Sequence, residues 1–272
     1  MKIAVVGSVN LDLVARTERL PRPGETITGA TLERIPGGKG GNQALAAARL
    51  GADVELVACV GRDAFAVEAT GELEAAGVTL ALHEAGDQTG VALIVVGADG
   101  ENQIVVSPGA NALLSPDDVD VAGADGVLCQ LEIPVETVQA AARADAFFCL
   151  NAAPARRLPR ELLERADLVV VNRLELELLG EVPGLVARTL GADGAVLLDE
   201  GREIAHAVPP PVTAVDGTAA GDAFTACLVV SHLEGRDWDE ALRRACIAGA
   251  IAASRPGAQP SLPTKEEVDA LL

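Results

Sequence analysis

The sequence has 272 residues, 49% of them hydrophobic and 2% aromatic, and a formal net charge of -19. Nucleic-acid surfaces need clustered Lys and Arg, and single-strand platforms need aromatic faces, so this composition excludes both. No apolar run reaches the roughly 20 residues of a membrane span, and Gly7 breaks the N-terminal apolar run too early for a signal peptide. The five Cys lie apart in apolar runs, as expected of buried thiols in a reducing compartment. We expect a cytoplasmic protein without a nucleic-acid or membrane partner, long enough for one large α/β domain or two smaller ones.

The first part of the sequence predicts strands and helices separated by glycines. Apolar runs bounded by Gly are typical of buried strands, and Ala-rich runs ended by Gly are typical of helices. The predicted strands are 3–6 and 54–60, and the predicted helices are 42–50 and 64–76.

Two stretches have a different, β-hairpin character. A Pro/Gly-rich stretch leads into alternating residues at 26–32, and runs at 91–96 and 103–107 are joined by a Gly-containing turn at 97–100. We therefore expect segments within about 11–35 and 83–107 to form a small β-strand lid on a single domain that spans 1–272.

The second half alternates regularly between the two kinds of element. The predicted strands are 126–130, 147–150 and 168–171, and the predicted helices are 134–144, 159–165 and two within 219–254, broken near Glu234. Such alternation favours parallel βαβ units. The expected fold is α/β, with a doubly wound, mostly parallel sheet.

The first motif that indicates chemistry is Gly37-Gly38-Lys39-Gly40-Gly41-Asn42-Gln43, directly before a predicted helix. Its N–H groups and the helix N-terminus can hold an oxygen-rich ligand. It lacks the spacing of a Walker A loop. A structural turn is the alternative, and Lys39 and Asn42 favour ligand binding.

The second motif runs from Asp216 to Phe224 and places Asp222 in the first turn of a predicted helix. A carboxylate there can simply complement the helix dipole, with a stabilisation of roughly 0.3–1 kcal/mol. Small residues precede it, however, and leave N–H groups open to a transferring phosphoryl group, with Asp222 placed as a base.

Polar residues also follow three predicted strands. Asn172 and Glu175 come directly after the strand at 168–171, where they can either cap a helix or order Mg²⁺. Asp12 and Glu132 follow other strands and are either ordinary turn acids or ligands of sugar hydroxyls.

Taken in order, these motifs resemble the PfkB/ribokinase family almost from end to end. The matching segments are Gly7-Ser-Val-Asn-Leu-Asp12, Pro23-Gly-Glu-Thr26, the loop 37–43, Thr89-Gly-Val-Ala92, Gly109-Ala-Asn-Ala112, Gln130-Leu-Glu132, Asn151-Ala-Ala-Pro-Ala-Arg156, Asn172-x-x-Glu175, Thr189-Leu-Gly-Ala-Asp-Gly194, Ala219-Ala-Gly-Asp222 and Gly257-Ala-Gln-Pro-Ser261.

The resemblance implies an ATP-dependent kinase that phosphorylates O5 of a sugar, first of all D-ribose to D-ribose 5-phosphate. It implies that the sugar is held by Asp12, Gly38, Lys39, Asn42, Glu132 and Asp222. Asp222 would be the base, and Ala219, Ala220 and Gly221 would form an anion hole. The nucleotide would meet Asn172, Thr189, Gly191 and Gly194, with Mg²⁺ bound through water to Glu175. The family's K⁺ loop corresponds to Asp216, Thr218, Ala252, Gly257 and Ser261, and its lid implies a homodimer.

Two other functions stay open. One is a kinase of the same fold for another sugar or a nucleoside, against which the scarcity of aromatic residues counts. The other is a catalytically weak sugar- or nucleotide-binding regulator.

The chain departs from the family pattern in three places. Gly217 stands where the family has Thr, and Arg173 where it has Glu. The interval 176–188 is short and contains Pro183-Gly184. Either the nucleotide side of the sheet is trimmed, which we favour, or 183–190 is itself a helix and Thr-Leu-Gly is misaligned.

Overall fold

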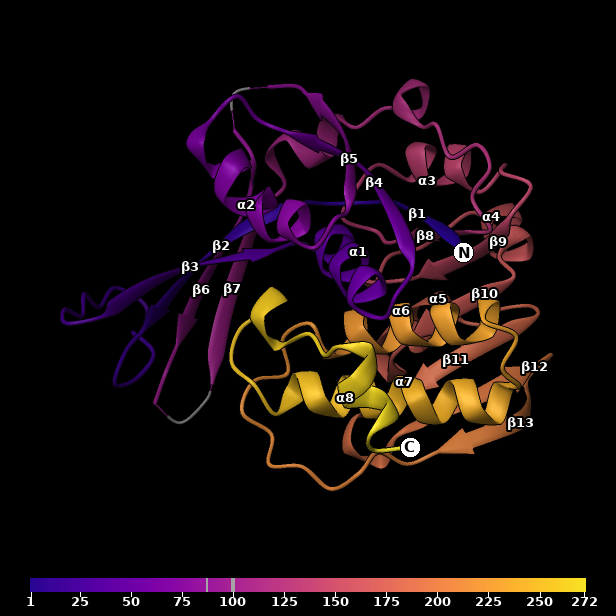
Figure 1. Ribbon diagram of the computed structural model, residues 1–272. Helices are drawn as coiled ribbons and strands as arrows, with labels where there is room; N and C mark the ends of the chain where they lie inside the picture. Colours follow the sequence, from indigo (N-terminus) through magenta and orange to yellow (C-terminus); the bar gives the residue numbers. More distant parts are fainter. Residues whose placement is uncertain (87, 99–100) are drawn as a thin grey trace.

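The computed structural model describes residues 1–86, 88–98 and 101–272, and its largest element is a nine-stranded sheet (Figure 1). The strand order is β13-β12-β11-β10-β9-β8-β1-β4-β5, and the strands from β11 to β5 in this order run parallel. Their bounds are β13 Arg202–Ala207, β12 Ala195–Asp199, β11 Leu185–Thr189, β10 Leu168–Val171, β9 Phe147–Asn151, β8 Gly126–Cys129, β1 Lys2–Val6, β4 Asp53–Val60 and β5 Thr79–Glu84. The predicted doubly wound, mostly parallel sheet is confirmed.

Helices cover both faces of this sheet, because successive side chains of a strand point to opposite faces. In β1, Val5 packs in the core shared with α1, α6 and α7, whereas Val6 packs in the core shared with α3 and α4. The helices are α1 Lys39–Arg49, α2 Ala64–Ala75, α3 Val135–Ala141, α4 Arg160–Arg165, α5 Arg173–Leu179, α6 Ala220–Leu233, α7 Trp238–Ala253 and α8 Lys265–Asp269. None of the helices in the described part of the chain is long and apolar enough to cross a membrane.

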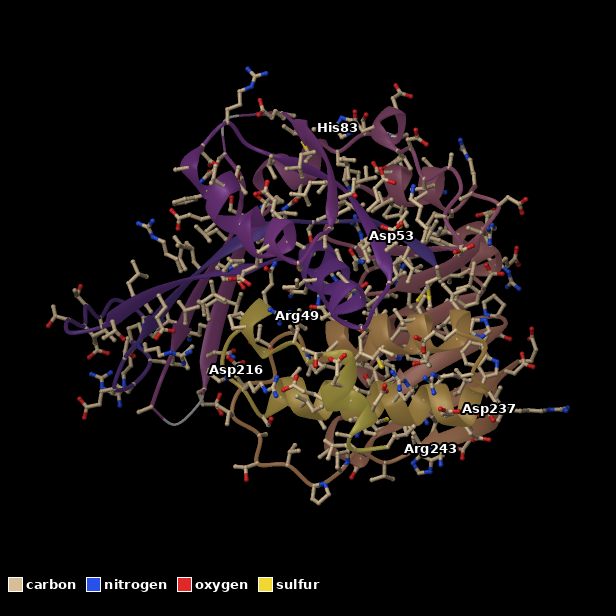
Figure 2. All side chains as sticks on the ribbon, viewed as in Figure 1. Arg49, Asp53, His83, Asp216, Asp237 and Arg243 are labelled. Carbon is tan, nitrogen blue, oxygen red and sulfur yellow. The ribbon has the colours of Figure 1, made fainter. Side chains whose placement is uncertain are left out.

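The C-terminal segment is fastened to α1. Arg49, the last residue of α1 (Figure 2), donates hydrogen bonds to the carbonyl oxygens of Gln259 (2.9 Å) and Leu262 (2.8 Å). The Gln259 side chain also reaches the first turn of this helix, because a Cβ at Gly41 would lie 3.2 Å from Gln259 Nε2.

A four-stranded sheet extends to one side of the large sheet (Figure 1). Its order is β3-β2-β6-β7, with bounds β3 Thr31–Gly37, β2 Asn10–Arg16, β6 Gly90–Val96 and β7 Asn102–Ser107. β6 and β7 pair antiparallel, as the hairpin prediction required, although residues 99 and 100 of its turn lie outside the described residues. Residue 87, within the predicted lid segment, lies outside them as well. The sheet is therefore assembled from the two stretches that the sequence singled out.

The short interval 176–188 holds the end of α5, a connection, and then β11. The alternative that residues 183–190 form a helix is wrong, because Leu185–Thr189 pairs in register with β10 and β12. The strand that leads into Thr-Leu-Gly is present and follows α5 closely, as the trimmed alternative requires.

Candidate active site

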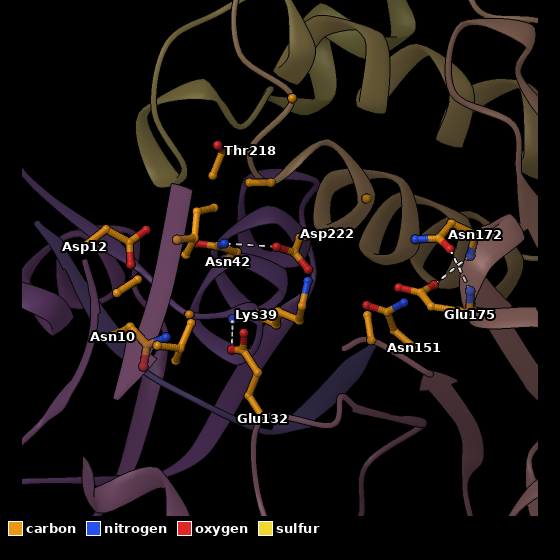
Figure 3. Close-up of a pocket in the computed structure, with 18 of the residues that line it drawn as sticks. Asn10, Asp12, Lys39, Asn42, Glu132, Asn151, Asn172, Glu175, Thr218 and Asp222 are labelled. Atoms are coloured by element: carbon orange, nitrogen blue, oxygen red, sulfur yellow. Dashed lines mark hydrogen bonds between the residues drawn. The ribbon is translucent and has the colours of Figure 1, made fainter. Parts of the chain in front are cut away.

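A cavity of about 430 Å³ lies between the small sheet, the carboxyl ends of β8 to β11, and the start of α6 (Figure 3). It brings together most of the residues that the sequence singled out. Those that line it are Asp12, Gly38, Lys39, Asn42, Glu132, Asn172, Glu175, Thr189, Thr218, Ala219, Gly221 and Asp222. Six separate segments of the chain therefore meet in one place.

Asp222 is the most enclosed acid of the cavity and is 4% exposed. Asn42 Nδ2 donates to its Oδ2 at 2.9 Å, and Gln43 Nε2 donates to its Oδ1 at 3.0 Å. Burial raises the pKa of Asp222, while Lys39 and the two amide donors oppose that rise. The carboxylate thus keeps acceptor capacity toward the cavity and is held in one orientation.

The turn before Asp222 has an unusual backbone. Ala219 has a φ of 60° at the N-cap of α6, a left-handed conformation that non-glycine residues seldom adopt. The Ala220 N–H donates to Gly217 O at 3.3 Å, and Ala220 does not line the cavity. The N–H groups of Gly221 and Asp222 donate to no main-chain oxygen among the described residues, and they lie at the positive end of α6.

The start of α1 forms the floor beside Glu132. Gly38, at its N-cap, has a φ of 83°, and a Cβ there would lie 2.7 Å from the Asn10 nitrogen. Glu132 Oε2 accepts from Lys39 N at 3.0 Å and from Ser8 Oγ at 2.5 Å. The carboxylate of Glu132 therefore complements the first turn of the helix and links the glycine-rich loop to Ser8, in the segment that follows β1.

The ionisable groups around the cavity are one lysine and several carboxyl groups. The Lys39 ammonium group faces Asp222, Glu132 and Glu175, which together raise the pKa of Lys39 against the opposing effect of burial. Burial, with the nearby charges of Glu132 and Asp222, raises the pKa of Asp12 from 3.8 to about 7. The cavity therefore holds a permanent cation and an acid poised to titrate near neutrality.

Asn172 and Glu175 form a reciprocal capping box at the start of α5. Asn172 Oδ1 accepts from Glu175 N at 2.9 Å, and Glu175 Oε2 accepts from Asn172 N at 2.6 Å. Both residues also line the cavity. Helix capping and Mg²⁺ binding, the two interpretations offered by the sequence, are therefore compatible. Burial raises the pKa of Glu175.

The remaining predicted residues lie around or beyond this cavity. Thr189 ends β11, and its hydroxyl is 3.4 Å from Val171 O. Gly191 and Gly194 bound a short 3-10 turn, and neither lines the cavity. Asp216, Thr218 and Gly257 line a neighbouring cavity of about 140 Å³ under the small sheet. Ala252 and Ser261 are buried and line neither of the two.

Asp216 joins the two loops that the resemblance assigns to K⁺. Its Oδ1 accepts from Thr218 N (2.9 Å) and Thr218 Oγ1 (2.6 Å), and its Oδ2 accepts from Gly257 N (3.0 Å). Burial opposes ionisation, but these hydrogen bonds outweigh it and lower the pKa of Asp216. In the described part of the chain, no group of three or more His, Cys, Asp or Glu is arranged to hold a metal ion.

Sequence reasoning gave no role to Asn10, Gln43 and Asn151. Asn10 lines the cavity, and its Oδ1 accepts from Asn111 Nδ2 at 2.7 Å. It lies two residues before Asp12 on the same face of β2, a periodicity that could have found it. Asn151 also lines the cavity and ends β9. Gln43, which directly follows Asn42 in the sequence, is fully buried and does not line the cavity.

Comparison with known proteins assigns the chain to a family. The pfkB family of carbohydrate kinases matches residues 1–265. The ribokinase of Bacillus subtilis is 38% identical, over 99% of both chains. A crystal structure of the Thermotoga maritima ribokinase superposes with a TM-score of 0.91 at 33% identity, covering 99% of this chain and 98% of that one. The Arabidopsis thaliana ribokinase complexed with ribose and ATP superposes with a TM-score of 0.87 at 32% identity, covering 99% and 97%. The chain therefore belongs to the pfkB family of carbohydrate kinases.

Proposed function

We propose that the protein transfers the γ-phosphoryl group of ATP to O5 of D-ribose, with Asp222 as the base. The observation that carries this proposal is the buried Asp222 carboxylate at the start of α6, facing a cavity lined by Asp12, Lys39 and Glu132. The ribokinases to which the chain is similar support the choice of sugar.

In the proposed reaction, Asp222 takes the proton of the sugar hydroxyl as its oxygen attacks the γ-phosphorus. The new O–P bond forms while the bond from the γ-phosphorus to the bridging oxygen breaks, and ADP leaves. The N–H groups of Gly221 and Asp222 stabilise charge on the transferred group. Ala219 and Ala220 shape this turn rather than bind through their side chains.

The sugar is proposed to lie between the small sheet and α1. Asp12, Asn42 and Glu132 present oxygens or an amide to its hydroxyl groups, and Gly38 lets the backbone approach closely. The unpaired, buried Asn42 Oδ1 is consistent with a partner supplied by a ligand. Asn10 is added to this set because it lines the same wall.

The nucleotide is proposed to enter beside Asn172 and Thr189, with Gly191 and Gly194 at its outer edge. Glu175 fits a water-mediated Mg²⁺, because its buried carboxyl has a raised pKa that a nearby cation would lower. When bound, Mg²⁺ neutralises charge on the phosphates.

A K⁺ requirement is proposed for the loops 216–218 and 252–261. The ionised Asp216 holds these loops together, and carbonyl-rich turns beside a carboxylate suit a monovalent cation. Asp216, Thr218, Ala252, Gly257 and Ser261 are the residues concerned. The test is turnover in K⁺ against Na⁺ buffers at equal ionic strength.

The small sheet is proposed to act as a lid over the single domain and to pair two subunits. Leu13, Leu93 and Val105 are in register across β2, β6 and β7, on the face opposite the cavity residues. Leu93 and Val105 are 50% and 66% exposed, which a partner face would cover. Sedimentation of Leu93→Glu against Ile204→Glu, on the far edge strand β13, tests this: only the first change should yield monomers.

The proposed activity is tested by coupled ADP production with a panel of sugars and nucleosides. D-ribose should give the highest kcat/KM, and the product should be phosphorylated at O5 by ³¹P NMR. A higher kcat/KM for a nucleoside, or no turnover above background with any sugar, would overturn the assignment.

A further inference from the structure

A chain of buried side-chain amides ends on Asp222. Gln43 Nε2 donates both to Asp222 Oδ1 and to Asn151 Oδ1, each at 3.0 Å. Gln130 Nε2 in turn donates to Gln43 Oε1 at 2.6 Å. Gln43 and Gln130 are 0% exposed. Three elements, α1, the end of β8 and the end of β9, thus meet behind one carboxylate.

The network fixes which end of each amide faces Asp222. An ionised Asp222 can only accept, so Gln43 must present its nitrogen to Asp222 and its oxygen to the N–H of Gln130. Asn151 Nδ2 donates to Val170 O at 3.2 Å, which leaves its oxygen for Gln43. A Cβ at Gly7 would lie 3.3 Å from Gln130 Cδ, so the end of β1 packs directly on this amide.

The two donors to Asp222 differ in their surroundings. Asn42 lines the cavity and has an unpaired oxygen, so a bound sugar can take over its hydrogen bonds. Gln43 does not line the cavity, and both of its amide atoms are already paired within the protein. Gln43 is therefore the donor that stays on Asp222 when substrate binds.

We propose that Gln43 is a positioning residue that holds Asp222 oriented and ionised for proton transfer, and that Gln130 and Asn151 fix Gln43 for this task. The inference rests on the proposed role of Asp222 as base. A buried carboxylate without N–H donors favours its protonated form, which cannot accept the sugar proton. A neutral amide stabilises the ionised form without exchanging a proton of its own.

Charged groups also face Asp222 from the elements around it. These are Lys39 of α1, Glu132 after β8, Glu175 of α5 and Asp12 of β2. Lys39 favours the ionised carboxylate, and the three acids oppose it. These four charged groups are unchanged in the variants of Gln43, Gln130 and Thr137 below, so a difference between those variants reports the loss of the amide hydrogen bond.

The test is the pH profile of kcat/KM for D-ribose in Gln43→Met, which removes both N–H donors at similar length. We expect kcat/KM to fall about tenfold at about pH 6, since a hydrogen bond to a charged group is lost, and clearly less at about pH 8.5. KM should change little, because the cavity wall is intact. Gln130→Met frees Gln43 to rotate and should shift the pH profile in the same direction but by a smaller amount. This variant replaces Gln43→Met in the test if Gln43→Met does not fold.

Thr137→Val is the matched control. Thr137 is also 0% exposed, and its hydroxyl donates to Leu114 O at 2.6 Å, away from Asp222. It should lose stability without moving the profile. If Gln43→Met and Gln130→Met lower kcat/KM by the same factor at every pH, the positioning role is overturned, while an inactive Asp222→Asn still supports the base. If Asp222→Asn keeps full turnover, the proposed base and the positioning role both fail.

Discussion

Asp12 should make the protein less stable as the pH rises, and Asp12→Asn should remove this effect. The carboxyl group is 7% exposed, and the described residues show no side-chain hydrogen bond to it. Burial first, and then Glu132 and Asp222, raise its pKa from 3.8 to about 7. Between these two values the folded protein holds a proton that the unfolded chain has lost, so the free energy of unfolding falls as pH rises.

The size of the effect follows from the two pKa values. Each pH unit between them corresponds to about 1.4 kcal/mol, so the full cost of the buried charge is roughly 4 kcal/mol well above pH 7. Part of that cost is already present at about pH 5. From there to about pH 8 the stability advantage of Asp12→Asn should therefore grow by roughly 2–3 kcal/mol.

Urea unfolding of wild type and Asp12→Asn at several pH values measures this difference. Asp216→Asn is the control of opposite sign, because the pKa of Asp216 is lowered and its stabilisation is fully present above the unfolded value. Its cost should stay constant from about pH 5 to about pH 8. If the advantage of Asp12→Asn does not change with pH, the carboxyl is not the titrating group and the reasoning is refuted.

Two further changes test the packing and charge of the same fold. Gly38→Ala should lower the free energy of unfolding by about 2 kcal/mol or more and raise the KM for D-ribose. The reason is that the left-handed N-cap of α1 and the nearby Asn10 nitrogen leave no room for a Cβ. A thermal unfolding temperature equal to that of wild type would contradict this. Arg244 is 0% exposed and pairs with Ser231 and Asp269. Asp269→Ala should therefore cost about 3 kcal/mol, more than Arg244→Met, because it strands a buried cation; the reverse order in urea unfolding would show that the pair is not coupled in this way.

Much of the fold could be predicted because its signals are local. Apolar runs bounded on one side by Gly mark β1, β4 and β8, and Ala-rich runs mark α1, α6 and α7. The strands β5, β12 and β13 were not predicted. Half-buried edge strands such as Arg202–Ala207 mix charged and apolar residues, and their pairing depends on neighbours far away in sequence.

The residues of the candidate site were predicted from motifs, but the hydrogen bonds that connect them were not. The positions of Asp12, Lys39, Asn42, Glu132 and Asp222 around one cavity agree with the expectation, while their roles stay proposals. The amide chain through Gln43 could not be derived from the sequence, because it joins residues 87 to 179 positions apart. Its local signal in the sequence is a Gln that ends the glycine-rich motif 37–43.

The measurement that tests the central claim most directly is D-ribose-dependent ADP formation by wild type and by Asp222→Asn, with the product identified by ³¹P NMR. Loss of the base should lower kcat by about 10³-fold while the fold, checked by circular dichroism and thermal unfolding, is kept. D-ribose 5-phosphate made by wild type and not by Asp222→Asn is the predicted result. Wild-type turnover retained in Asp222→Asn, or no sugar phosphate from wild type, would contradict the account.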